Sequence, residues 1–321
     1  MSDIAERLRQ ATQVITDAVE KYDLKAIVAL NSGGHDSLLS TWCAAQHPLF
    51  QGAVFANTGI GTIETRAFVR DTHQQYGWPL IELKNSLMTY EMLLVRYGYP
   101  SPVTHQMMYR HLKDRQFEEA ITIFSKKLGC KRGQIGLVTG LRKWESRKRQ
   151  LTVKPVKIHK EAKAKSPKRV FLAPCHDFHE SERNEAIEWL NLPTNRFAKY
   201  IGHSYECMCG ANMGADERER RAKYAPIYEE AERKREALVK AAYDLQQFRL
   251  ENGLIDPEDA TINGERLTWG WHTGTPFTYE DTEDDDTLCA GCMVKRAPDG
   301  TAGVDIDRLM LEKRDEVHLT L

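Results

Sequence analysis

A short run of small and polar residues, Ser32-Gly-Gly-His-Asp-Ser37, directly follows the apolar stretch 26–31. We expect a strand over 26–31 and a helix that begins near Ser37. Gly33 and Gly34 have no Cβ, so the chain can turn sharply there and point its backbone N–H groups inward. The first turn of the helix adds unpaired N–H donors and the positive end of the helix dipole. The pattern predicts a binding site for phosphate or pyrophosphate, without the lysine of a Walker motif.

Four segments, in chain order, resemble motifs of one group of nucleotide-binding proteins. The run 32–37 resembles the PP-loop of the ATP pyrophosphatase superfamily, whose members cleave ATP between the α and β phosphates. The other segments are similar to motifs of its phosphoadenosine phosphosulfate (PAPS) reductase-like family: Asn57-Thr58-Gly59 with Glu64-Thr65, Tyr97-Gly-Tyr-Pro100 with Tyr109-Arg110-His-Leu-Lys113, and Gly140-Leu-Arg142-Lys-Trp-Glu145-Ser146. The resemblance spans residues 26–210. The chain departs from the family at Asn57, where aspartate is usual, and at Met108, where many relatives have cysteine.

The resemblance implies roles for the matched residues. Those expected to bind the nucleotide are Ser32, Gly33, Gly34, Asp36, Ser37, Asn57, Thr58, Gly59, Gly140 and Arg142. Those expected to be catalytic are Asp36, beside the Mg²⁺ that accompanies ATP, with Arg142 and Glu145. A forked guanidinium suits an α-phosphate or the charge on departing pyrophosphate. The alternatives are a plain turn for the loop and a surface ion pair for Arg142 and Glu145; Arg110 and Lys113 suit either phosphate or solvent.

Four cysteines form two closely spaced pairs, Cys207-Met-Cys209 and Cys289-Ala-Gly-Cys292. Paired thiolates in tight turns suit a metal ion or an iron–sulfur cluster. The family resemblance favours a [4Fe-4S] cluster on these four residues, with Zn²⁺, a redox pair or structural cysteines as alternatives. We expect Cys43 to lie in the core and Cys175 to serve packing.

Apolar periodicity and turn residues predict an alternation of strands and helices. Strands are expected at 26–31, 52–56, 79–83, 134–139 and 169–173, and helices at 3–22, 37–46, 62–76, 86–96, 106–128, 180–190 and 216–251. Alternation of this kind predicts an open, mostly parallel, twisted α/β sheet with helices on both faces. We expect a nucleotide-binding domain over 1–200. The remainder, 201–321, would be a helical, cysteine-rich, metal-binding appendage with a helical insertion over 216–251. We expect this insertion to pack on the core by one apolar stripe, formed by Ile227, Ala231, Leu238, Ala242 and Leu245.

Composition and charge limit the other possibilities. The 321 residues contain no apolar run long enough to span a membrane, no secretory signal and only seven cysteines, so a cytoplasmic protein with reduced thiols and no membrane partner is expected. Segment 142–169, predicted irregular, holds twelve lysines and arginines against two glutamates. It is either a solvated loop or a nucleic-acid contact. An acidic run at 280–286 could mask it, and Trp269 and Trp271 with His272 suit base stacking or packing near the cysteines.

The resemblance implies an enzyme that binds ATP and Mg²⁺ and converts a substrate to its adenylate, which sulfur or nitrogen then attacks. We expect sulfur transfer onto a nucleic acid, as in DNA phosphorothioation or tRNA thiolation, with a sulfur-donor protein such as a cysteine desulfurase as partner. One alternative is a sulfonucleotide reductase, although the last residues, 315–321, lack the Glu-Cys-Gly-Leu-His tail of those enzymes. The other is a non-catalytic nucleotide- and DNA-binding module.

Overall fold

The structure is a computed structural model, and it describes residues 3–100, 105–159, 169–196, 204–209, 211, 219, 223, 226–254, 261–262 and 265–266. The chain forms two compact units. The first comprises Met1–Asn85 and Arg110–Met208, and the second Ser86–Tyr109 and Cys209–Leu321. This grouping differs from the expected division at residue 200, because the stretch 86–109 groups with the C-terminal part of the chain.

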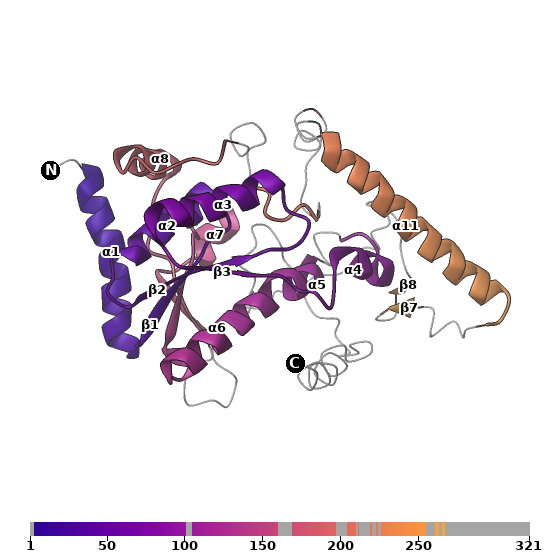
Figure 1. Cartoon of the computed structure of the whole chain (residues 1–321), viewed down its shortest axis with the longest axis horizontal. Coiled ribbons are helices and arrows are strands. Elements are labelled where there is room, and N and C mark those ends of the chain that lie inside the picture. The colour runs from indigo at the N-terminus through magenta and orange to yellow at the C-terminus, as the bar shows by residue number, and fades with distance from the viewer. Residues whose placement is uncertain are drawn as a thin grey trace. The chain divides into compact units, whose positions relative to one another are not determined.

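The first unit is built on a six-stranded sheet in the order β3-β2-β1-β4-β6-β5. Its strands are β1 (Ala26–Leu30), β2 (Phe50–Ala56), β3 (Leu80–Leu83), β4 (Ile135–Val138), β5 (Val156–His159) and β6 (Arg169–Leu172). All neighbours are parallel except β5 and β6. Strands β1, β4 and β6 are buried along their length, whereas the edge strands β3 and β5 are half-buried. The predicted, mostly parallel α/β sheet is confirmed (Figure 1).

Helices cover both faces of this sheet. The helices are α1 (Asp3–Tyr22), α2 (His35–Ala45), α3 (Ile63–Tyr76), α6 (Arg115–Leu128), α7 (Arg147–Thr152) and α8 (Glu180–Trp189). Helices α1, α2 and α8 pack together and share one apolar core with the strands, while α6 packs against β2, β3 and β4. Buried apolar side chains recur along α1 at Ile4, Leu8, Ala11, Ile15 and Ala18, which is the expected helical spacing.

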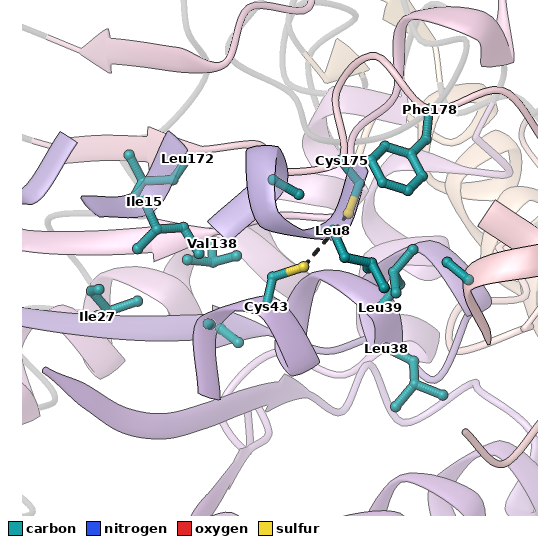
Figure 2. Close-up of a cluster of buried hydrophobic side chains, with 14 of the residues drawn as sticks. Leu8, Ile15, Ile27, Leu38, Leu39, Cys43, Val138, Leu172, Cys175 and Phe178 are labelled. Carbon is teal, nitrogen blue, oxygen red and sulfur yellow. Dashed lines mark hydrogen bonds between the residues drawn. The ribbon is translucent and has the colours of Figure 1, made fainter. Parts of the chain in front are cut away.

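Two thiols meet inside this core (Figure 2). The Sγ atoms of Cys43 on α2 and Cys175 after β6 lie 4.0 Å apart. Both residues are essentially inaccessible to solvent, which confirms the expected core position of Cys43 and packing position of Cys175. The hydrogen bond with Cys175, together with burial, raises the pKa of the Cys43 thiol well above its ordinary value. Cys43 therefore acts as a small apolar group at neutral pH.

Two segments differ from their expected form. The basic stretch after β4 was expected to be irregular but contains α7 and β5, because Val156 and Ile158 alternate with polar residues and pair with β6. The single helix expected over 106–128 consists of α5 (His105–Tyr109), a π-helical turn (Arg110–Asp114) and α6. Single π turns of this kind often occur at functional sites.

In the second unit, α4 (Tyr90–Tyr97) packs against the long helix α11 (Pro226–Glu251), and β7 (Thr261–Ile262) pairs with β8 (Glu265–Arg266). The expected apolar stripe on the long helix is wrong, since Ile227, Leu238 and Leu245 are exposed and Val239 is fully buried. On the side of α11 that faces α4, Arg235 pairs with Glu91 (3.0 Å) and lies over the Tyr90 ring. None of the helices among the described residues combines the length and apolar character needed to cross a membrane.

Candidate functional site

The loop after β1 is held by a turn around Asn31. The Asn31 Oδ1 atom accepts hydrogen bonds from the Gly33 N–H (2.9 Å) and from the Ser37 hydroxyl (3.2 Å). Its Nδ2 atom lies 3.0 Å from Nε2 of His73, so Nε2 accepts and the imidazole is neutral. Burial lowers the pKa of His73 and favours this form. The loop is thus fixed by a strand-end asparagine, a common device in turns.

Two glycines allow the loop to fit among its neighbours. Gly33 has φ +77°, and a Cβ there would lie 2.8 Å from Thr65 Cγ2 and 2.9 Å from Val69 Cγ2. Gly140, after β4, approaches the start of α2 so closely that a Cβ would lie 2.5 Å from the Ser37 amide nitrogen. The expected glycine turn is therefore present, and a side chain at either position would displace backbone or core.

The N-terminus of α2 lacks a side-chain cap. Its N-cap is Gly34, and no side chain accepts a hydrogen bond from the first turn. By contrast, the side chains of Thr62 and Thr89 cap α3 and α4. The α2 end therefore presents backbone donors and the positive end of the helix dipole without a side-chain cap, which is an arrangement that binds anions, and Asp36 is the acidic residue of its first turn.

Asp36, on the first turn of α2, is bound by two arginines. Arg142 Nε lies 2.5 Å from Oδ1, and Arg183 NH1 lies 3.2 Å from the same oxygen. Both arginines are at least nine-tenths buried, and Arg142 also donates to the Phe178 carbonyl (3.2 Å). Arg183 also pairs with the exposed carboxylate of Glu180 (2.9 Å), so the two carboxylates and two guanidiniums of the cluster carry no net formal charge. The expected proximity of Asp36 to Mg²⁺ stays a prediction, and it would require exchange of these ion pairs.

This cluster lies where ligands bind in open α/β sheets. Asp36 follows β1 and Arg142 follows β4, which are neighbouring strands from which the chain proceeds in opposite directions across the sheet. A crevice at the carboxyl ends of such strands is the usual binding position. Arg183, from α8, completes the cluster and was not anticipated. Its sequence context, between Glu180 and Glu185 on a polar helix, resembles a solvated surface.

The loop after β2 uses the same asparagine turn. Asn57 Oδ1 accepts the Gly59 N–H (3.0 Å), and Asn57 Nδ2 donates to Glu82 Oε1 on β3 (2.6 Å). Glu82 in turn pairs with Arg70 (2.8 Å), and these hydrogen bonds hold the pKa of Glu82 below its ordinary value. The asparagine at this position thus matches a neighbouring carboxylate that an aspartate would repel.

A segment from far along the chain lies over this second loop. The Thr58 hydroxyl donates to the Glu206 carbonyl (2.6 Å), and the Thr62 N–H donates to the Tyr205 carbonyl (3.0 Å). Lys113, on the π-helical turn, pairs with the Glu206 carboxylate. Burial acts to raise the pKa of Glu206, but Lys113 outweighs it and leaves the pKa below its ordinary value. Lys113 is therefore engaged by protein, while its contact with phosphate stays a prediction.

The remaining predicted residues lie further from the cluster or outside the described residues. Glu145 accepts the Arg142 backbone N–H (3.1 Å) and pairs with Arg149, so it supports the local turn. Cys207 is half-buried and Cys209 is buried. Cys289 and Cys292, with Trp269, Trp271 and His272, lie outside the described residues. Within the described part of the chain, no three histidine, cysteine or acidic side chains gather as a metal site, so the cluster stays a prediction.

Comparison with known proteins gives similarities in fold. A PAPS reductase from Candida auris, solved as a phosphate complex, matches with a TM-score of 0.43 and 15% identity over 62% of this chain and 92% of that chain. An FMN adenylyltransferase from Candida glabrata matches with a TM-score of 0.43 and 16% identity over 62% of this chain. The match spans 64% of the adenylyltransferase, less than two thirds of its length. No family model and no curated protein matches the chain.

Proposed function

We propose that the chain binds the phosphates of ATP at the loop 32–37 and transfers the adenylyl group to a substrate, with release of pyrophosphate. The observation that supports this most directly is the uncapped end of α2 beside the Asp36, Arg142 and Arg183 cluster, at the reversal point of the sheet. Backbone donors and the helix dipole, beside two buried guanidiniums, together favour a polyphosphate.

In the proposed reaction, a nucleophilic oxygen of the substrate attacks the α-phosphorus of ATP. The bond from that phosphorus to the oxygen bridging the β-phosphate breaks, and pyrophosphate leaves with the electron pair. The amides at the start of α2 stabilise the charge on the departing group, and the buried guanidiniums act where charge accumulates. Gly33 and Gly140 contribute by allowing backbone rather than side chain to face the phosphates.

We further propose sulfur transfer onto a nucleic acid as the use of this adenylate, with a cysteine desulfurase-type donor. The acceptor class is supported by the basic segment that follows Arg142. The second candidate, a sulfonucleotide reductase, would use the same loop to hold its substrate and would release sulfite in the presence of thioredoxin. The two reactions therefore differ in their products.

Incubation with ATP labelled at the α-phosphate, Mg²⁺ and a nucleic-acid acceptor tests the proposal. We expect pyrophosphate in an amount equal to the label found as acceptor adenylate plus free AMP, and almost no cleavage by Gly33→Ala. The matched control is Gly77→Ala at the end of α3, where φ is +63° but no atom lies within 4 Å of the added Cβ. Equal loss in both variants, or ADP and phosphate as products, would exclude cleavage at this loop.

A further inference from the structure

An exposed aromatic pair lies beside the candidate site. The Trp144 indole stacks on the His179 imidazole, with ring centroids 4.3 Å apart and an interplanar angle of 18°. Trp144 retains 44% of its exposure despite this contact, and His179 is also exposed. Trp144 therefore leaves nearly half of its surface in water, although the ring is stacked on His179.

The pair is held in place from both sides. The Lys143 N–H donates to the His176 carbonyl (2.8 Å), and Arg142 NH1 donates to the Phe178 carbonyl (3.2 Å), so the two loops that carry the rings are joined. The His179 N–H donates to the Glu182 carboxylate (2.7 Å) in the first turn of α8. A fixed ring pair loses little conformational freedom when a third planar group stacks on it.

The segment that carries Trp144 is basic, whereas the segment that carries His179 is acidic, with Asp177, Glu180 and Glu182. Between residues 142 and 157 the sequence has seven lysines and arginines and one glutamate. Arg147 and Lys154 are exposed, and so is Leu151, at 85%. Aromatic faces among cations are the combination that binds single-stranded nucleic acid, with bases on the rings and phosphates on the cations.

We propose that Trp144, supported by His179, stacks on a base of a single-stranded nucleic acid acceptor. The inference rests on the proposed function in taking a nucleic acid as the acceptor. It deepens that function because it assigns the recognition of an unpaired base to one surface, next to the phosphate loop. His179 is a positioning residue in this arrangement.

Fluorescence anisotropy of a labelled 20-nucleotide oligothymidine, with the full chain and without ATP, tests the proposal. We expect Trp144→Ala to weaken binding about tenfold and Trp144→Phe to recover most of it. The matched control is Trp189→Ala, since Trp189 is 55% exposed at the end of α8, and this variant should bind as the wild type does. Thermal unfolding of each variant establishes that the fold is retained.

An abasic oligonucleotide of equal length and charge separates base stacking from phosphate contacts. We expect it to bind the wild type more weakly than oligothymidine and to bind Trp144→Ala equally weakly. Equal affinity of wild type and Trp144→Ala for oligothymidine would overturn the proposal, as would no binding by the wild type. Selective loss of ATP binding in Trp144→Ala would instead assign the rings to the adenine of the nucleotide. If Gly33→Ala still binds oligothymidine, the stacking role of Trp144 is supported independently of whether the protein cleaves ATP.

Discussion

The turns that end β1 and β2 have the same construction and different surroundings. In each, an asparagine at the strand end accepts the N–H of a glycine two residues later, at 2.9 Å for Asn31 and 3.0 Å for Asn57. Both glycines have positive φ, +77° at Gly33 and +81° at Gly59. Local sequence, Asn-Ser-Gly and Asn-Thr-Gly, therefore produces one backbone shape at two adjacent strands.

The helix after each turn gives that turn a different use. The first turn runs at once into α2, whose end is uncapped, so its donors face a prospective anion. The second turn continues to Thr62, whose side chain caps α3. The Thr58 hydroxyl and the Thr62 N–H donate to carbonyl groups of the segment 204–206. The two turns therefore share one backbone shape. They differ in whether hydrogen-bond donors near the turn are already bound by another segment of the protein.

The largest effect is expected at Asp36, which has no counterpart in the second turn. Asp36→Asn leaves the buried Arg142 guanidinium without its anion and Arg183 with Glu180 alone, and removal of one partner from a buried ion pair costs about 3–5 kcal/mol. Urea unfolding should therefore show a loss of about 3 kcal/mol. Adding Arg183→Gln should restore part of it, and strictly additive losses would argue against direct pairing.

The two glycines should respond unequally to alanine. Both variants strain a positive φ, but the Cβ at Gly33 meets core methyl groups, whereas the Cβ at Gly59 meets the flexible end of Lys84 at 3.1 Å. We expect losses in unfolding free energy of about 3 kcal/mol for Gly33→Ala and about 1 kcal/mol for Gly59→Ala. Equal losses would mean that the turns are packed alike.

Replacing either asparagine by aspartate should make the stability of the two turns depend on pH in different ways. Asn57→Asp sets two carboxylates against each other and loses the hydrogen bond to Glu82, which should cost about 1–2 kcal/mol at pH 7 and less near pH 4, where one is protonated. Asn31→Asp instead favours protonated His73, so its cost should already shrink as pH falls through about 6.5. Unfolding at pH 4.5, 6 and 8 measures both, and a shared pH window would contradict these partners.

The smallest effect is expected from His73 in the wild type. Burial lowers its pKa below 6.5, so the unfolded chain binds a proton more readily, and stability present above pH 6.5 is lost as pH falls toward the folded-state pKa. Burial also lowers the pKa of His35, His47 and His176. His73→Gln should therefore make the decline between pH 7 and pH 5 shallower without abolishing it, and an unchanged slope would exclude its contribution.

The sequence predicted the sheet, most helix positions and the glycine turn after β1, because periodicity and glycine placement are local properties. It did not predict Arg183 beside Asp36, since only the packing of α8 on α2 brings residues 147 positions apart together. Strand β5 was also missed, because this short edge strand alternates apolar and polar residues within a lysine-rich segment and lacks the apolar run of a central strand. The prediction of the buried face of α11 was wrong. Val239 is buried and Arg235 pairs with Glu91, whereas the leucines of the predicted stripe are exposed.

The adjacent buried thiols of Cys43 and Cys175 can be used to measure how often the core beneath α2 opens. An alkylating reagent reaches them only when α2 separates from the strands beneath it, since both are sealed in the folded state. The rate at which they are modified therefore measures opening of α2, the helix that begins within the loop 32–37. Slower labelling in the presence of ATP would register occupancy of that loop without any turnover.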